Sequence, residues 1–273
     1  MPRPSLEIFK GRWLDIRLKP HHKADFVLKT PTTIFDPFLE RELTRYERRK
    51  LHNSKIVCAY DVKRRKNGII LVTTNIDFET IYRFIYSSEF PAHYESEYAT
   101  HPASIYNRIP HVISVACFIE VAVRGVPKYL ILVRRSKHVL GGKKKIHVIG
   151  GLFDAKDGSL QNAILGEIRD EVGIKSSELD FIGENFQVQK KSNNPKAFAF
   201  IASRALAQVS VIYIARTNLP IEVIKKRWKK AKDKEEADIL IFAERKPEIL
   251  RQFLSSASSP KLLELYVDSL ARS

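Results

Sequence analysis

Three carboxylates lie close together in a segment with helical spacing. Glu167, Asp170 and Glu171 stand at i, i+3 and i+4 within residues 160–172, so a helix would bring them together within one turn. Like charges at this spacing repel one another, and a bound cation would offset the repulsion. Mg²⁺ takes oxygen ligands and is usually shared between a few carboxylates, water and substrate phosphates. The spacing therefore favours a divalent-cation site, although such a run on one helix is more often a solvated face.

The residues around the carboxylates predict how they are positioned. Apolar residues at 160, 164 and 168 repeat at i, i+4 and i+8 and would hold the helix against a sheet. The loop before it, residues 150–159, begins with Gly150 and Gly151 and ends with Ser159, a typical helix N-cap. A glycine-rich turn, a capped helix and an acidic cluster together indicate a site for a metal-bound diphosphate.

Residues 150–174 resemble the Nudix box, a signature that begins with glycine and ends in Arg-Glu-aliphatic-x-Glu-Glu-x-Gly-aliphatic. The matching positions of the second half are Glu167, Ile168, Asp170, Glu171, Gly173 and Ile174. Two positions depart from the signature. Gly166 stands where the family has an arginine that orients a metal-binding glutamate, and Gly158 stands where it has an upstream glutamate. These departures bear on catalysis and leave the acidic residues in place.

The resemblance extends beyond the box, over roughly residues 111–254. Residues 132–136 and 146–151 resemble the strand pair that enters a Nudix box, with Arg134 and Arg135 reaching the substrate's phosphates. Residues 234–242 resemble a late acidic loop and strand that supplies another carboxylate in many members. The N-terminal segment is faintly similar to that of larger Nudix proteins akin to UDP-glucose diphosphatases.

The resemblance implies a metal-dependent site in this chain. Mg²⁺ or Mn²⁺ would be held by Glu167, Asp170 and Glu171 with a backbone carbonyl near Gly151. The general base that takes the proton of water would be Glu171, or Glu235 or Glu236 from the late loop. The residues predicted to bind substrate are Arg134, Arg135, His147, Gly150 and Gly151. Lys143, Lys144 and Lys145 are equally well interpreted as phosphate contacts or as solvated surface charges.

The remaining pattern predicts an α/β fold with two domains. Residues 1–110 form an N-terminal α+β domain with a charged helix at 38–50, a hairpin of 56–62 and 68–74, a helix at 77–86 and a linker at 91–110. Residues 111–273 form the Nudix-like domain, an α/β/α sandwich around a mixed sheet. Its strands are expected at 112–123, 129–135, 145–149, 181–189, 196–203, 209–215 and 237–243. Its helices are expected at 160–172, 221–232, 247–254 and 261–270, with a flexible break at 255–260.

Composition limits the partners and the compartment. The 273 residues carry 47 Lys and Arg against 31 Asp and Glu, a net charge of +16, which raises the expectation of a polyanionic partner. A basic run at 221–234 fits a solvated helix face, a phosphate-contacting surface or, in a eukaryote, a nuclear-import signal. Cys58 and Cys117 are expected to be reduced and buried, and no apolar run approaches the length of a membrane span. We therefore expect a cytoplasmic protein without a membrane partner.

Two functions remain at this stage. The first is a Mg²⁺- or Mn²⁺-dependent Nudix-type hydrolase that cleaves the diphosphate of a nucleotide sugar, ADP-ribose, a dinucleotide or a nucleotide cap. The second is a non-catalytic Nudix-like module that binds a nucleotide or RNA. A homodimer is a candidate state for either.

Overall fold

The computed structural model describes residues 6–9, 13–20, 54–66, 68–85, 90–137, 144–189, 194–203 and 207–272. The chain forms two compact units. Unit 1 comprises residues 1–115, 152–163 and 196–212, and unit 2 comprises residues 116–151, 164–195 and 213–273. The division into domains at residue 110 stays a prediction. The predicted helix at 38–50 lies outside the described residues.

Unit 1 contains a hairpin that joins a mixed set of strands. β3 (Lys55–Arg65) pairs antiparallel with β4 (Gly68–Asp77), and β2 (Asp15–Pro20) runs parallel to β4. The first residues of β5 (His111–Val123) pair with β3 through Cys58 and Ala59. β1 (Leu6–Phe9) and the start of β11 (Gln208–Thr217) flank β10 (Ala199–Ser203), all antiparallel. The two hairpin strands are thus confirmed.

The segment expected to be a linker at 91–110 is helical, so that prediction is wrong. After α3 (Phe78–Ile85), the chain forms α4 (Phe90–Thr100), the 3-10 turn η1 (Pro102–Ser104) and α5 (Ile105–Arg108). Burial explains the difference, because Phe90, Tyr94 and Ile105 enter one apolar cluster with Ile56 and Cys58. The Tyr, His and Pro residues that indicated a loop therefore include the residues that anchor these helices to the sheet.

A buried histidine makes unit 1 sensitive to acid. The His111 Nδ1–H donates to the Ile109 carbonyl oxygen at 2.8 Å, and Nε2 accepts from the Tyr94 hydroxyl at 2.8 Å. Burial lowers the pKa of His111 from 6.5 to about 4, although the bond to Ile109 acts in the opposite sense. As the pH falls, the unfolded state protonates His111 near pH 6.5, before the folded state does so near pH 4. The free energy of unfolding therefore decreases progressively from pH 6.5 to pH 4.

We therefore expect the free energy of unfolding to fall by about 3 kcal/mol through this one group between pH 6.5 and 4. Urea denaturation at several pH values measures the loss, and NMR titration of the imidazole assigns it. A His111 resonance that titrates near pH 6.5 in the folded protein would contradict the prediction.

Unit 2 is built on three long antiparallel strands. β6 (Val126–Arg135) pairs with the second half of β5 on one side and with β12 (Ala237–Glu244) on the other. The end of β6 also pairs with β7 (Ile146–His147), which is followed by β8 (Ile149–Leu152). β9 (Asp180–Phe181) pairs with the end of β11. These strands confirm the predictions for 112–123, 129–135 and 237–243.

The strand expected at 181–189 is almost absent. Only β9 and one isolated bridge form, and the 3-10 turn η4 (Glu184–Phe186) interrupts the segment. Asn185 and Phe186 have φ angles of 54° and 56°, which belong to the left-handed region and cannot continue a strand. The apolar alternation of the sequence did not reveal this turn.

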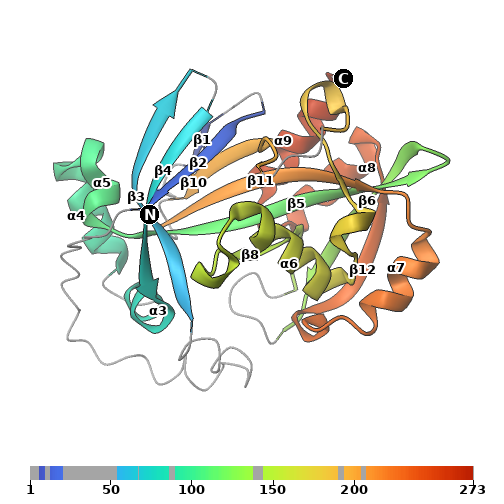
Figure 1. Ribbon diagram of the computed structural model, residues 1–273, viewed down its shortest axis with the longest axis horizontal. Helices are drawn as coiled ribbons and strands as arrows, with labels where there is room; N and C mark the ends of the chain where they lie inside the picture. Colours follow the sequence, from blue (N-terminus) through green and yellow to red (C-terminus); the bar gives the residue numbers. More distant parts are fainter. Residues whose placement is uncertain are drawn as a thin grey trace. The chain divides into compact units, whose positions relative to one another are not determined.

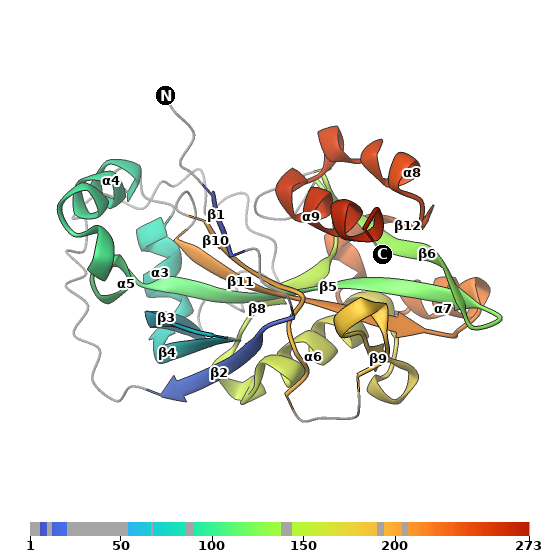
Figure 2. The ribbon, with the colours of Figure 1, turned by 90° about the horizontal axis from the view of Figure 1, so that it is seen from above.

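Helices cover both faces of the unit 2 strands. α6 (Leu160–Val172), which begins in unit 1, and α7 (Ile221–Trp228) lie on one face, and α8 (Pro247–Arg251) and α9 (Pro260–Leu270) lie on the other (Figures 1 and 2). The short turns are η2 (Ala155–Asp157, in unit 1), η3 (Ser176–Glu178), η6 (Lys234–Glu236) and η7 (Leu254–Ser256). The α/β class with a mixed sheet is confirmed. Among the described residues, no helix is long and apolar enough to cross a membrane.

α6 has the bounds that its periodicity predicts. Ile164, Ile168 and Val172 are fully buried, so the apolar stripe faces the sheet. The Ser159 hydroxyl accepts from the Asn162 N–H at 3.1 Å at the N-terminus. Gly173 ends the helix with φ of 74°, a left-handed conformation that glycine adopts without strain. The packed stripe fixes the rotation of α6 and hence the direction of its carboxylates.

Candidate functional site

Two of the predicted carboxylates of α6 meet the glycine turn before it. The Gly150 N–H donates to Glu171 Oε1 at 3.3 Å. The Glu167 carboxylate lies so close to the Gly151 backbone that an added Cβ at Gly151 would overlap its Oε1 and Cδ atoms. Glycine at 151 is therefore what leaves room for the Glu167 carboxylate beside β8.

A third carboxylate comes from η6. The Ser136 N–H donates to the Glu236 carbonyl oxygen at 2.9 Å, which ties η6 to the end of β6. The Glu236 carboxylate lies 4.0 Å from the Arg135 guanidinium. Burial raises the pKa of Glu171 well above its usual value, and the charges of Glu167 and Glu236 raise it further. The Gly150 N–H and Arg135 oppose that shift, so three carboxylates and one guanidinium share a single electrostatic environment.

Arg135 reaches the carboxylates, whereas Arg134 lies beside β12. Arg134 Nη2 lies 3.9 Å from Asp238 Oδ2 of β12. Its Nε atom is buried without a hydrogen-bond partner among the described residues. The guanidinium groups are part-exposed, with side-chain exposures of 41% for Arg134 and 25% for Arg135. Lys144 and Lys145 are exposed, and Lys143 lies outside the described residues.

Asp170 does not join the other two carboxylates of α6. It accepts from Arg169 Nε at 2.7 Å and from Lys232 Nζ at 3.0 Å. Burial acts to raise the pKa of Asp170, but these two hydrogen bonds outweigh it and the pKa is lowered. Its backbone oxygen also accepts from the Asp233 N–H at 2.9 Å. Asp170 thus anchors the segment that leads into η6.

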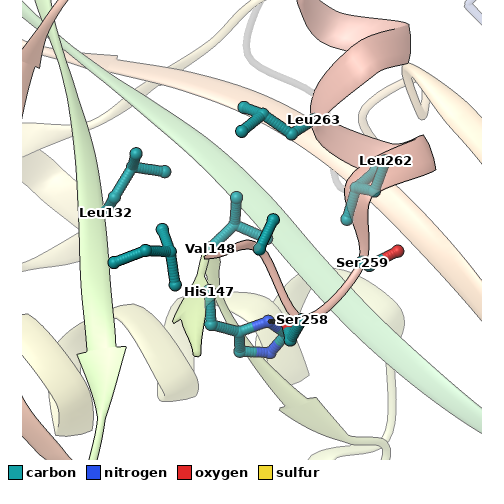
Figure 3. A pocket seen from close by; sticks show the side chains of 9 residues that line it. Leu132, His147, Val148, Ser258, Ser259, Leu262 and Leu263 are labelled. Atoms are coloured by element: carbon teal, nitrogen blue, oxygen red, sulfur yellow. Dashed lines mark hydrogen bonds between the residues drawn. The ribbon is translucent and has the colours of Figure 1, made fainter. Parts of the chain in front are cut away.

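His147 lies at the rim of a small pocket next to the N-terminus of α9. His147 Nδ1 and the Ser258 hydroxyl oxygen are 2.7 Å apart (Figure 3). Burial and, to a smaller extent, the charge of Arg135 together lower the pKa of His147 to about 3, which keeps the imidazole neutral. The other side chains are mainly apolar: Leu132, Ile146, Val148, Ala257, Ser259, Leu262 and Leu263. The cavity volume is about 10 Å³, far below the roughly 300 Å³ of a small ligand site, so the pocket is too small for a nucleotide. None of the three carboxylates lines it.

Ser258 is a contact that sequence reasoning missed. Residues 255–260 are predicted to be a flexible break. In the structure, Ala257 forms an isolated parallel β-bridge with Ile146, and the Ser258 N–H donates to the Ile146 carbonyl oxygen at 2.7 Å. A run of serines before a proline carries no signal for such pairing. The pairing appears only when α9 packs on the sheet and brings this segment beside β7.

The two departures from the Nudix box have different structural settings. Gly158 has φ of 69°, which a glutamate adopts only with strain, so glycine suits the turn at this position. Gly166 lies inside α6, and an added Cβ would meet no atom within 4 Å. Packing therefore leaves room for a side chain at 166, and the missing arginine is not imposed by the fold.

The carboxylates partly fit a divalent cation. No group of three His, Cys, Asp or Glu side chains in the described part of the chain is arranged to hold a metal ion. Mg²⁺, however, usually keeps several waters and is bound by one or two carboxylates together with substrate phosphates. The pairing of Glu167 and Glu171 beside Gly150 and Gly151 is of that kind.

The chain has distant structural neighbours among known proteins. No family model matches the chain, and no curated protein matches it. The chain aligns with the DR0079 protein of Deinococcus radiodurans at 18% identity over 56% of this chain and 81% of that one, with a TM-score of 0.39. It aligns with a C. elegans Ap4A hydrolase at 14% identity over 59% of this chain and 99% of that one, with a TM-score of 0.36.

A third alignment is with the NUDIX domain of Shewanella oneidensis NrtR, solved with ADP ribose. The identity is 15% over 64% of this chain and 98% of that one, with a TM-score of 0.35. The solved structures with which the chain aligns thus include Nudix proteins. At these identities and scores they assign no activity, substrate or metal to this chain.

Proposed function

We propose that unit 2 is a Nudix-type hydrolase that cleaves the diphosphate linkage of a nucleoside diphosphate joined to another moiety. The observation that carries the proposal is the placement of Glu171 against Gly150 and of Glu167 against Gly151. The charges of Glu236 and Arg135 also act on Glu171, and Arg135 pairs with Glu236. Three clustered carboxylates repel one another, so the arrangement is costly unless cations join it. A metal-bound diphosphate supplies both the cation and an anion for the arginines.

Each residue has a role that follows from its position. Glu167 and Glu171 would hold Mg²⁺ or Mn²⁺, together with the backbone carbonyl near Gly151. When bound, the metal ion lowers the pKa of water and polarises a phosphate oxygen. Arg135 binds the phosphate oxygens on which negative charge develops, which is usually the main contribution to such catalysis. Arg134, whose part-exposed guanidinium lies 3.9 Å from Asp238, is a second candidate for phosphate binding.

The proton of the attacking water needs a carboxylate as acceptor. Glu171 and Glu236 are the candidates within the cluster, whereas Glu235 is exposed on the same turn. A carboxyl group whose pKa is raised by its surroundings is the better base near neutral pH, provided that it is ionised there. Glu171 has such a raised pKa, and Glu236 is less exposed than Glu235, so we assign the role to Glu171 and Glu236 rather than to Glu235.

Gly151→Ala tests the close approach of Glu167 to β8. The added methyl group displaces the far end of a flexible side chain, so we expect the free energy of unfolding to change by less than about 1 kcal/mol. Displacement of the carboxylate should weaken Mn²⁺ binding at least about tenfold and lower kcat/KM about 100-fold. Isothermal titration calorimetry and turnover assays measure these effects.

Gly166→Ala is the matched control for that variant, because its methyl group meets no atom within 4 Å. It should leave Mn²⁺ affinity unchanged. If both variants weaken Mn²⁺ binding equally, Gly151 is not part of the metal site.

The alternative is a Nudix-like module that binds a nucleotide without hydrolysing it. The glycine at 166 and the absence of a three-ligand metal group among the described residues favour it. Both proposals predict nucleotide binding, and only the first predicts turnover. The cytoplasm suits either one, since both cysteines are buried and free.

A substrate panel separates the two proposals. The full-length protein is incubated with a nucleotide sugar, ADP-ribose, a dinucleotide and a capped oligonucleotide, each with Mg²⁺, with Mn²⁺ and with EDTA. Metal-dependent release of nucleoside monophosphate supports the hydrolase. Nucleotide binding with no turnover on any substrate supports the module, and neither binding nor turnover overturns both.

A further inference from the structure

α7 and the turn after it carry a cluster of exposed lysines that the proposed site does not use. Lys225, Lys226, Lys229, Lys230, Lys232 and Lys234 are all exposed in unit 2. The clustering is costly, because like charges three and four positions apart on a helix repel one another. The question is which of these charges are already paired within the protein.

Three of these six lysines have partners. Lys225 donates to Glu222 at 3.0 Å, Lys232 donates to Asp170 at 3.0 Å, and the Lys234 ammonium lies 5.8 Å from the centre of the Trp228 ring. Lys226, Lys229 and Lys230 make no ion pair with any residue that the structure describes. Lys226 lies on α7, and Lys229 and Lys230 lie in the turn that follows it. The Lys229 N–H donates to the Lys225 carbonyl oxygen and the Lys230 N–H to the Arg227 carbonyl oxygen, so the turn continues the helical path and keeps the three lysines near one another. We name them the α7 lysine face.

The apolar residues of α7 point away from that face. Ile224 is fully buried, and the indole Nε1 of Trp228 is buried without a hydrogen-bond partner among the described residues. On the inner side, Lys225 lies 6.0 Å from the Phe242 ring of β12, beside which α7 lies in Figure 1. The outer face is therefore cationic and lacks the exposed apolar side chains with which an amphipathic helix enters a bilayer. Its charge fits a hydrated polyanion better than a membrane.

The α7 lysine face leads directly into the candidate site. After Lys230, the chain is fixed to α6 by the Lys232 to Asp170 ion pair and by the Asp233 N–H, which donates to the Asp170 carbonyl oxygen at 2.9 Å. The next turn, η6, carries Glu236 into the carboxylate cluster.

We propose that the α7 lysine face binds the phosphate backbone of a single-stranded nucleic acid. Lysine ammonium groups contact backbone phosphates as point charges, and binding releases the counterions condensed on the strand. The affinity therefore falls as salt rises, with a slope of about 0.7 in log K per log salt for each phosphate neutralised on a single strand. This binding does not require that the site hydrolyse anything.

The test compares two triple variants of the full-length protein with equal charge. One replaces Lys226, Lys229 and Lys230 by glutamine, and the control replaces three exposed lysines of unit 2 on other elements, namely Lys128, Lys175 and Lys261. Fluorescence anisotropy with a labelled single-stranded RNA is measured in EDTA between 50 and 300 mM salt, roughly the range over which counterion release is pronounced. Anionic phosphatidylserine vesicles serve as a second probe.

We expect the α7 triple variant to bind RNA at least about tenfold more weakly at 0.1 M salt and to reduce the salt slope by about 2. The control should stay within about twofold of the unchanged protein. Equal weakening by both variants would assign the binding to net charge and overturn the proposal. The absence of RNA binding, or binding only to vesicles, would overturn it as well. Because EDTA excludes metal-dependent turnover, none of these outcomes depends on the hydrolase proposal.

Discussion

Glu171→Gln is expected to lower kcat/KM for a diphosphate substrate by about 10²–10⁴-fold, the usual loss when a general base is removed. The substitution keeps the shape of the side chain and an oxygen that can accept from the Gly150 N–H. It removes the charge that would hold a cation and take a proton. Steady-state kinetics with Mg²⁺ and with Mn²⁺ measure the loss.

The same variant should not be less stable than the unchanged protein. The Glu171 carboxyl is partly enclosed and faces the charges of Glu167 and Glu236, so a neutral amide relieves repulsion in the folded state. We expect an unchanged or higher midpoint of thermal unfolding. Loss of activity together with unfolding at a lower temperature would mean that Glu171 supports the fold instead.

Glu235→Gln is the matched control, since it removes the same charge from an exposed residue next to Glu236. It should retain full activity. If Glu235→Gln is as damaging as Glu171→Gln, the assignment of the base within the cluster is wrong.

Glu120→Gln is expected to lower the free energy of unfolding by about 3 kcal/mol, because it breaks a buried ion network. Glu120 lies on β5 with no exposed surface. Its Oε2 accepts from Arg216 at 3.0 and 2.7 Å, and its Oε1 accepts from Arg245 at 2.6 Å and from the Tyr266 hydroxyl at 2.9 Å. The neutral amide leaves two largely buried guanidinium groups without a counter-charge.

The network joins distant parts of unit 2, which is why its loss should be felt globally. Arg216 lies next to the last residue of β11, Arg245 follows β12, and Tyr266 lies on α9, where its ring stacks on Phe118 at 4.4 Å between centroids. Urea denaturation measures the effect, and Glu244→Gln is the control because Glu244 is exposed and pairs only with a surface lysine. A difference below about 1 kcal/mol between the two variants would contradict the prediction.

The sequence predicted elements well where one periodicity governed a long segment. α6 was predicted at its observed bounds, because its apolar stripe and the glycine after it come from local interactions. The sequence predicted elements poorly where contacts with residues distant in sequence determine the local structure. The helices at 90–108 depend on a shared cluster with β3, and the turn at 184–186 depends on left-handed residues that no local pattern marked.

The candidate site shows the same division. The three carboxylates of α6 could be named from spacing, but spacing cannot tell which of them share an environment. Asp170 forms ion pairs with Arg169 and Lys232. The charge of Glu236, more than sixty residues away in sequence, acts on Glu171 together with the charge of Glu167. The partner of each charge is set by loops packed from elsewhere in the unit.

By itself, the sequence determined the acidic helix, the glycine turn before it and the excess of positive charge, because residue types and local periodicity suffice for these. Only the tertiary structure decided which carboxylates act on Glu171, that Gly151 gives room to Glu167, and that the three lysines of the α7 lysine face are left unpaired by the described residues. The physical reason is that electrostatic and steric interactions act through space over a few ångströms, and the fold alone sets those distances.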